Sequence, residues 1–110
     1  MAKTILTDPW ANRFVHKALP LIRKEFSPQK VIIFGSRAKG KARKESDLDV
    51  ILVSSTFKDV KFLKRMPMVL RKIPFPKHID YICYTPEELE SLKDSSIILD
   101  EALKEGIEVS

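Results

Sequence analysis

Apolar residues recur with two different spacings along this chain, and the spacing predicts where helices and strands form. The pair Asp8 and Pro9 is typical of a helix start, and apolar residues then recur at roughly helical spacing as far as Phe26. Because proline has no N–H to donate, we expect Pro20 to kink or split this helix. A polar break over 27–30 separates the helix from the next element.

Four later segments are typical of strands. The run 31–34 is apolar and mostly β-branched, as expected for a buried strand, and 47–54 and 77–84 combine apolar residues with an alternating pattern. A last short run, 107–109, is expected to add an edge strand. These segments predict a small sheet.

Helical stretches are expected between and after these strands. The segment 58–72 has a helical pattern of apolar and basic residues, although Pro67 lies inside it. A capping-box pattern at 85–88 opens the next helix, and a final helix over 95–105 is ended by Gly106. The simplest architecture is an α/β fold of the α+β kind, in which helices cover the sheet on one side or both.

Length, composition and charge are typical of one soluble domain. We expect a single domain over 1–110, with 44% apolar and 32% charged residues arguing against disorder. The net charge of +5 favours polyanionic partners such as nucleotides, RNA or an acidic protein surface. We expect a cytoplasmic protein with no membrane contact, because no long apolar run or signal-peptide core occurs. The single Cys83 fits a reducing compartment and an inert, buried thiol.

Three carboxylates are the candidate metal ligands. Asp47 and Asp49 project from one face of a predicted strand, where like charges repel and a cation between them is favoured. Mg²⁺ prefers such oxygen ligands together with substrate phosphates. If the strand that carries Asp80 pairs alongside, the three carboxylates could hold two ions about 3.5 to 4 Å apart, the spacing that clamps both oxygens of an in-line displacement.

A candidate phosphate site precedes these carboxylates. Gly35 can adopt backbone angles closed to other residues and lets a phosphate approach, and Ser36 offers a hydroxyl and an N–H. We expect a helix that begins near Ser36 and presents its N-terminus to an anion. Basic residues that could neutralise a triphosphate or hold an acidic partner follow: Arg37, Lys39, Lys41, Arg43 and Lys44.

The run GSRAKG at 35–40, followed by DLD at 47–49, resembles the G-S-x10-D-x-D signature of the nucleotidyltransferase superfamily that includes DNA polymerase beta and kanamycin nucleotidyltransferase. The short length is similar to its minimal branch. Four fixed identities at this spacing recur by chance in roughly one chain in a thousand. The resemblance covers the whole chain and extends to Asp80 in HIDYICY, although no motif fixes the distance to that third aspartate.

The resemblance implies a nucleotidyltransferase fold with a small mixed sheet, and a role for each site residue. Gly35, Ser36 and Arg37 would bind the phosphates of ATP or another nucleoside triphosphate. The three aspartates at 47, 49 and 80 would be the catalytic residues and the ligands of two Mg²⁺ ions, and a nucleoside monophosphate would be transferred to a hydroxyl. Members of the minimal branch often accompany a helical HEPN-type toxin and act as antitoxins by adenylylating one of its tyrosines, which implies such a partner here.

Simpler interpretations of these residues stay open. Asp47 and Asp49 could be solvent-facing charges at a strand start, and Asp80 could pair with a nearby cation such as Lys77. His16 and His78 fit structural or exposed positions better than catalytic ones. A basic loop is more often a solvated surface than a binding site.

Two other functions are compatible with the sequence. One is a non-catalytic nucleotide-binding module that neutralises a partner by contact. The other is an aminoglycoside-like small-molecule nucleotidyltransferase, with an acceptor pocket at a homodimer interface. An RNA-directed transferase is also possible given the net charge of +5, but nucleic acid is not otherwise indicated, because the sequence resembles no RNA-binding motif and has no aromatic stacking platform.

Overall fold

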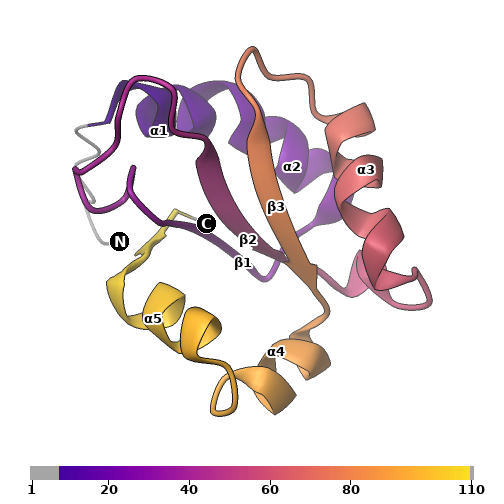
Figure 1. The fold of residues 1–110 in the computed structure, drawn as a ribbon. Coiled ribbons are helices and arrows are strands. Elements are labelled where there is room, and N and C mark those ends of the chain that lie inside the picture. The colour runs from indigo at the N-terminus through magenta and orange to yellow at the C-terminus, as the bar shows by residue number, and fades with distance from the viewer. Residues whose placement is uncertain (1–7, 110) are drawn as a thin grey trace.

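A four-stranded sheet lies between two groups of helices in the computed structural model, which describes residues 8–109 (Figure 1). In chain order the elements are α1 (Pro9–Arg13), the π-helix η1 (Phe14–Ala18), α2 (Leu19–Phe26), β1 (Lys30–Phe34), β2 (Leu48–Val53), the 3₁₀-helix η2 (Ser55–Phe57), α3 (Phe62–Lys72), β3 (Ile79–Tyr84), α4 (Pro86–Leu92), α5 (Ile97–Glu105) and β4 (Ile107–Glu108). This confirms the predicted mixture of a small sheet with helices.

The first helical stretch is split, as the sequence predicts. Asp8 caps α1 by accepting a hydrogen bond from the N–H of Ala11. The π-helical turn that follows ends just before Pro20, which cannot donate to the carbonyl four residues earlier. The chain therefore changes its hydrogen-bond pattern where the proline removes a donor.

The sheet has the strand order β3-β2-β1-β4 and is mixed. β1 pairs antiparallel with β2 and with the short edge strand β4, whereas β2 and β3 are parallel and are joined through α3. In this register Asp49 of β2 lies between Phe34 of β1 and Asp80 of β3. The predicted edge strand near the C-terminus is confirmed.

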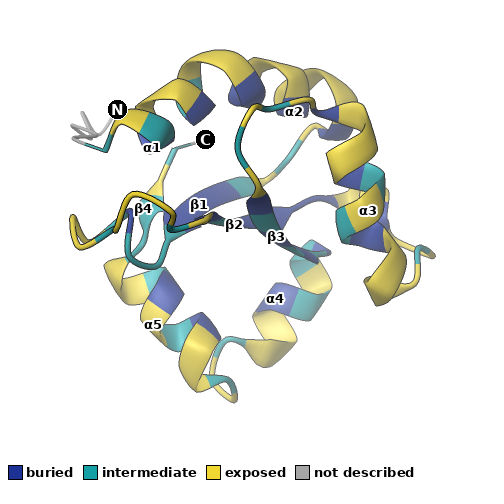
Figure 2. Ribbon diagram, turned by 45° about the horizontal axis from the view of Figure 1, so that its top comes forward, coloured by how far each residue is buried: buried dark blue, intermediate teal, exposed yellow. Residues whose placement is uncertain are grey.

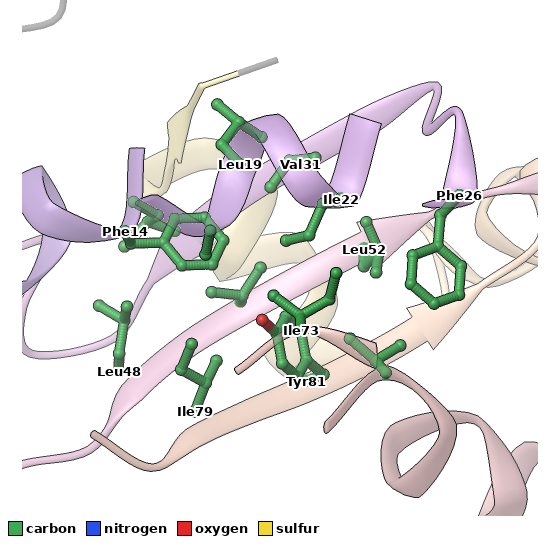
Figure 3. Packing of buried hydrophobic residues seen from close by; sticks show 14 of the residues in the cluster. Phe14, Leu19, Ile22, Phe26, Val31, Leu48, Leu52, Ile73, Ile79 and Tyr81 are labelled. Carbon is green, nitrogen blue, oxygen red and sulfur yellow. The ribbon is translucent and has the colours of Figure 1, made fainter. Parts of the chain in front are cut away.

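Each face of the sheet is covered by its own hydrophobic layer. The helical layer of α1, η1, α2 and α3 packs on one face, where Phe14 and Ile22 share a buried cluster with Leu48 and Leu52 of β2 (Figure 3). Helices α4 and α5 cover the other face, with Leu99 in its core (Figure 2). Because strand side chains alternate, this two-sided burial explains why β1 and β2 are apolar almost throughout.

Two predicted helices differ from the structure. The segment after Gly35 forms turns instead of the helix expected near Ser36, and its hydrogen bonds include the N–H of Ala38 to the carbonyl of Gly35 at 3.1 Å. The helix expected over 58–72 begins only at Phe62, because Asp59 has a left-handed backbone with φ +66°. Pro67 is accommodated inside α3.

A buried arginine ties α4 to the opposite layer. Arg65 of α3 donates to the carbonyl of Cys83 at 3.1 Å and binds the carboxylate of Glu88 through both terminal nitrogens. Glu88 also completes the predicted capping box with Thr85, which is confirmed. The hydrogen bond from Arg65 is the main cause of a lowered pKa for Glu88. Cys83 is buried as expected, and no helix within the described part of the chain is long and apolar enough to cross a membrane.

Candidate active site

The structure brings the three candidate carboxylates together at one end of the sheet. Asp49 and Asp80 are register partners on the parallel strands β2 and β3, and Asp47 immediately precedes β2. Strand alternation places Asp49 and Asp80 on the same sheet face as Ile51 and Ile82, which belong to the α4/α5 layer. Oxygen atoms of Asp47 and Asp80 lie within 4.8 Å of each other.

The three carboxylates are close enough to repel one another, which affects the pKa of Asp49. The pKa of Asp49 is raised, first because the group is partly buried and then because Asp80 and Asp47 are negatively charged neighbours. Among residues 8–109, no lysine or arginine forms an ion pair with any of the three. The site therefore concentrates negative charge without a cationic side chain to balance it.

The turn after β1 fits closely around Asp49. Gly35 has a left-handed backbone with φ +76°, and a Cβ atom at this position would lie 2.3 Å from Oδ2 of Asp49. The turn is closed by the N–H groups of Ala38 and Lys39, which donate to the carbonyl of Gly35. The residue after the β1 strand must therefore lack a side chain if the carboxylate is to keep its position. Ser36 follows in the same turn and is half-buried.

Arg37 points into the protein and not toward the carboxylates. Its Nη1 donates to Oδ1 of Asp8 at 2.8 Å, and its Nε donates to the carbonyl of Ser46 at 2.9 Å. Its Nη2 donates to the carbonyls of Arg43 and Lys44. The side chain is 5% exposed, so the expectation that Arg37 binds nucleotide does not fit its placement. Arg37 instead fixes the loop before β2 against the start of α1.

Replacing this arginine should destabilise the fold. In Arg37→Ala the carboxylate of Asp8 and three loop carbonyls lose their donors, and we expect the free energy of unfolding, measured by urea denaturation, to fall by about 3 kcal/mol. Arg43→Ala is the matched control, because that side chain is exposed and should change the value by less than about 0.5 kcal/mol. Equal losses in the two variants would contradict this role for Arg37.

His78 joins the cluster, although the sequence favours a structural or exposed role for it. Its Nε2 lies 3.2 Å from Oδ1 of Asp80, and the two groups share the cluster with Asp47. The imidazole is about half exposed, at 49%. The strand alternation that places His78 on the face of Asp80 is the signal that could have identified it. His16 instead lies on the π-helix and contacts the carbonyl of Asn12.

The donor set fits hard divalent cations. Ligand atoms of Asp47, His78 and Asp80 lie within 4.8 Å of one another, and Asp49 adjoins them as the register partner of Asp80. Within residues 8–109, no lysine or arginine pairs with these carboxylates. Magnesium prefers oxygen ligands. Burial is the main cause of the raised pKa of Asp49, and a bound cation would relieve the repulsion from Asp80 and Asp47 that adds to it. Asp47, Asp49 and Asp80 are therefore suited to hold such an ion.

Two hollows flank this site. One, of about 200 Å³, lies between β1 and α5 and is lined by Phe34, Gly35 and Glu101 among others. The other, of about 400 Å³, lies at the connection between α3 and β3 and reaches His78. The first hollow thus reaches Gly35, the close neighbour of Asp49, and the second reaches His78, which contacts Asp80.

Comparison with known proteins identifies the family of this chain. A model of the nucleotidyltransferase domain family matches residues 15–104. Among solved structures, the chain is similar to the crystal structure of a putative nucleotidyltransferase from Sulfolobus solfataricus, with 28% sequence identity and a TM-score of 0.59 over 98% of this chain and 89% of that one. A search of curated proteins found no match. Because the family match spans most of the chain and includes the glycine turn and all three aspartates, this protein belongs to the nucleotidyltransferase domain family.

Proposed function

We propose that this protein is a magnesium-dependent enzyme that transfers a nucleoside monophosphate, AMP from ATP, to a hydroxyl group. The observation that carries the proposal is the convergence of Asp49 and Asp80 with Asp47, directly beside the side-chain-free turn at Gly35. Membership of the nucleotidyltransferase family supports transfer of a nucleotidyl group in general.

Different residues of the site would bind the phosphates and the metal ions. Gly35 and Ser36 would bind the β and γ phosphates, because the turn leaves room for close approach to its backbone. Asp47, Asp49 and Asp80 would hold two magnesium ions. When bound, these ions would supply positive charge to the phosphate oxygens that become more negative during transfer.

The transfer itself needs little covalent chemistry from the chain. The acceptor oxygen forms a bond to the α-phosphorus, the bond from that phosphorus to the bridging oxygen breaks, and pyrophosphate leaves. The acceptor's proton would pass to a carboxylate oxygen of Asp80, whose side chain is 51% exposed at the open side of the site. Catalysis would then consist mainly of positioning and charge stabilisation.

We propose a tyrosine of a HEPN-type toxin as the acceptor, which would make this protein an antitoxin of the cytoplasm. The support is that the segment 35–49 resembles the superfamily signature and that the short chain is similar to the minimal branch, in which such pairs occur. The alternative is a small-molecule nucleotidyltransferase whose acceptor pocket lies at a homodimer interface.

The test is incubation with α-labelled ATP, Mg²⁺ and the protein encoded by the neighbouring gene. We expect label on a tyrosine of that protein, and none when Asp47→Ala replaces the wild type or when EDTA removes the metal. Label that persists with Asp47→Ala would overturn the assignment of the site. Neutralisation of the partner without any label would instead favour the contact-only module.

A further inference from the structure

Charge is divided between the two helical layers of this protein. Residues 8–79, which include α1, η1, α2 and α3, contain 17 lysines and arginines against 6 acidic residues, whereas 80–109 contain 2 against 9. These two groups of helices lie on opposite faces of the sheet (Figure 2). The carboxylate site lies at the boundary between a basic side and an acidic side.

The larger hollow beside the site lies on the basic side. This groove, of about 400 Å³, lies at the connection between α3 and β3, and its lining combines polar surface with the apolar residues Leu70, Ile73 and Phe75. Lys77 and His78 also line it, and Nε2 of His78 lies 3.2 Å from the carboxylate of Asp80. The groove is therefore connected to the carboxylates through His78.

The register of the sheet separates this groove from the phosphate-binding turn. Phe34, Asp49 and Asp80 are successive neighbours across β1, β2 and β3, and Gly35 directly follows Phe34. A triphosphate bound at Gly35 would occupy the β1 side, which leaves the groove on the β3 side for the acceptor. This step rests on the proposed function.

Two cations stand beside the groove without a carboxylate partner. Nζ of Lys77 lies 5.5 Å from the ring centre of Trp10, and Cζ of Arg13 lies 5.6 Å from it. The same indole packs edge-on against Phe75 of the groove wall, with ring centres 5.9 Å apart. No ion pair of Arg13 or Lys77 with an acidic side chain occurs within residues 8–109. Their charge therefore remains uncompensated next to apolar walls.

We propose that this groove binds an acidic segment of the acceptor polypeptide, next to the hydroxyl that receives the nucleotide. The apolar walls suit peptide side chains, and the flanking cations complement acidic ones. A nucleic-acid strand fits less well, because the aromatic rings here are already occupied. Trp10 is covered by the two cations, and Phe75 packs against Trp10 and Phe14, so base stacking would have to displace these contacts.

The test is fluorescence anisotropy with three labelled probes: a short peptide in which one tyrosine is flanked by Glu and Asp, the same peptide with Gln and Asn, and a short single-stranded RNA. We expect the acidic peptide to bind best, with affinity that falls as salt rises. Lys77→Glu and Arg13→Glu should each weaken it about fivefold to tenfold. Lys58→Glu is the matched control, because this exposed lysine follows η2, beyond the end of β2 opposite the carboxylates.

A further variant and a measurement of ATP binding distinguish misfolding, failure of the groove proposal and failure of the proposed function. Lys77→Gln, with its thermal melting curve, guards against misfolding and should show a smaller loss than Lys77→Glu. Equal binding of the two peptides, equal losses in Lys58→Glu and Lys77→Glu, or Lys77-dependent binding of the RNA alone would each overturn the groove proposal. Binding of ATP with Mg²⁺ is measured on the same preparations. Its absence would overturn the proposed function, whereas its presence without peptide binding would overturn only the groove proposal.

Discussion

Asp49→Asn is expected to lower the rate of nucleotidyl transfer by at least about a thousandfold and at the same time to stabilise the fold. The amide keeps the size of the side chain but removes the negative charge that lies nearest the glycine turn. The rate is measured as label transferred from α-labelled ATP at saturating Mg²⁺. The matched control is Asp94→Asn, at an exposed position between α4 and α5, which should leave the rate unchanged.

The expected gain in stability follows from the raised pKa of Asp49. Burial is its main cause, and Asp80 and Asp47 add to it. Because Asp49 holds its proton more tightly in the folded state, its protonation favours folding. This effect is complete below the ordinary pKa near 4 and is lost as the pH rises through the raised folded-state pKa. At neutral pH the ionised carboxylate therefore opposes folding, and Asp49→Asn should raise the melting temperature by about 2 to 4 °C without metal.

Magnesium should reverse this order of stability. In the wild type, added Mg²⁺ relieves the repulsion and should raise the melting temperature, whereas Asp49→Asn has lost one ligand and should respond weakly. A metal-free variant that melts below the wild type, or one that retains full transfer activity, would show that Asp49 is a structural carboxylate. The two readouts thus separate a metal-binding role from a packing role.

The convergence of the carboxylates could be anticipated because it depends on short-range patterns. Alternation along one strand places Asp49 on a defined face, and a parallel neighbour joined through a helix brings Asp80 to the same end of the sheet. The alternation is contained in a run of a few residues, whereas the pairing of β2 with β3 joins distant parts of the chain and is a condition of the prediction. On the other side of β2, the antiparallel register with β1 places Phe34 opposite Asp49.

The role of Arg37 could not be anticipated in this way. Its local context is a basic loop beside a phosphate-binding turn, which favours an anion as its partner. In the structure its ion-pair partner is Asp8, 29 residues earlier, and its other acceptors are carbonyls of its own loop. No periodic pattern encodes such contacts, because they depend on how the loop folds against α1. The helix expected near Ser36 fails for a related reason, since the loop is held by this arginine and by turns.

Gly35→Ala is expected to reduce nucleotidyl transfer by about a hundredfold or more, because the new methyl group would displace the carboxylate of Asp49. Its Cβ would lie 2.3 Å from Oδ2 and 3.2 Å from Cγ of that side chain. Gly40→Ala is the matched control. It also has a left-handed backbone, with φ +71°, but nothing lies within 4 Å of its added Cβ. Both substitutions should cost about 1 kcal/mol of backbone strain, whereas only the first should add the clash with Asp49 and lower the transfer rate.

A double-mutant cycle identifies the clash with Asp49 as the cause. In an Asp49→Ala background the carboxylate is gone, and the remaining contact of the added methyl group is with Cβ of residue 49 at 3.5 Å, an ordinary packing distance. The extra loss of unfolding free energy caused by Gly35→Ala should then shrink to the value measured for Gly40→Ala. If the loss stayed the same in both backgrounds, the backbone of the turn and not the carboxylate would explain why glycine is needed at position 35. If Gly40→Ala impaired transfer as strongly as Gly35→Ala, the conformation of the whole loop would set the rate. The close contact between the turn and Asp49 would then not be what holds the site in place.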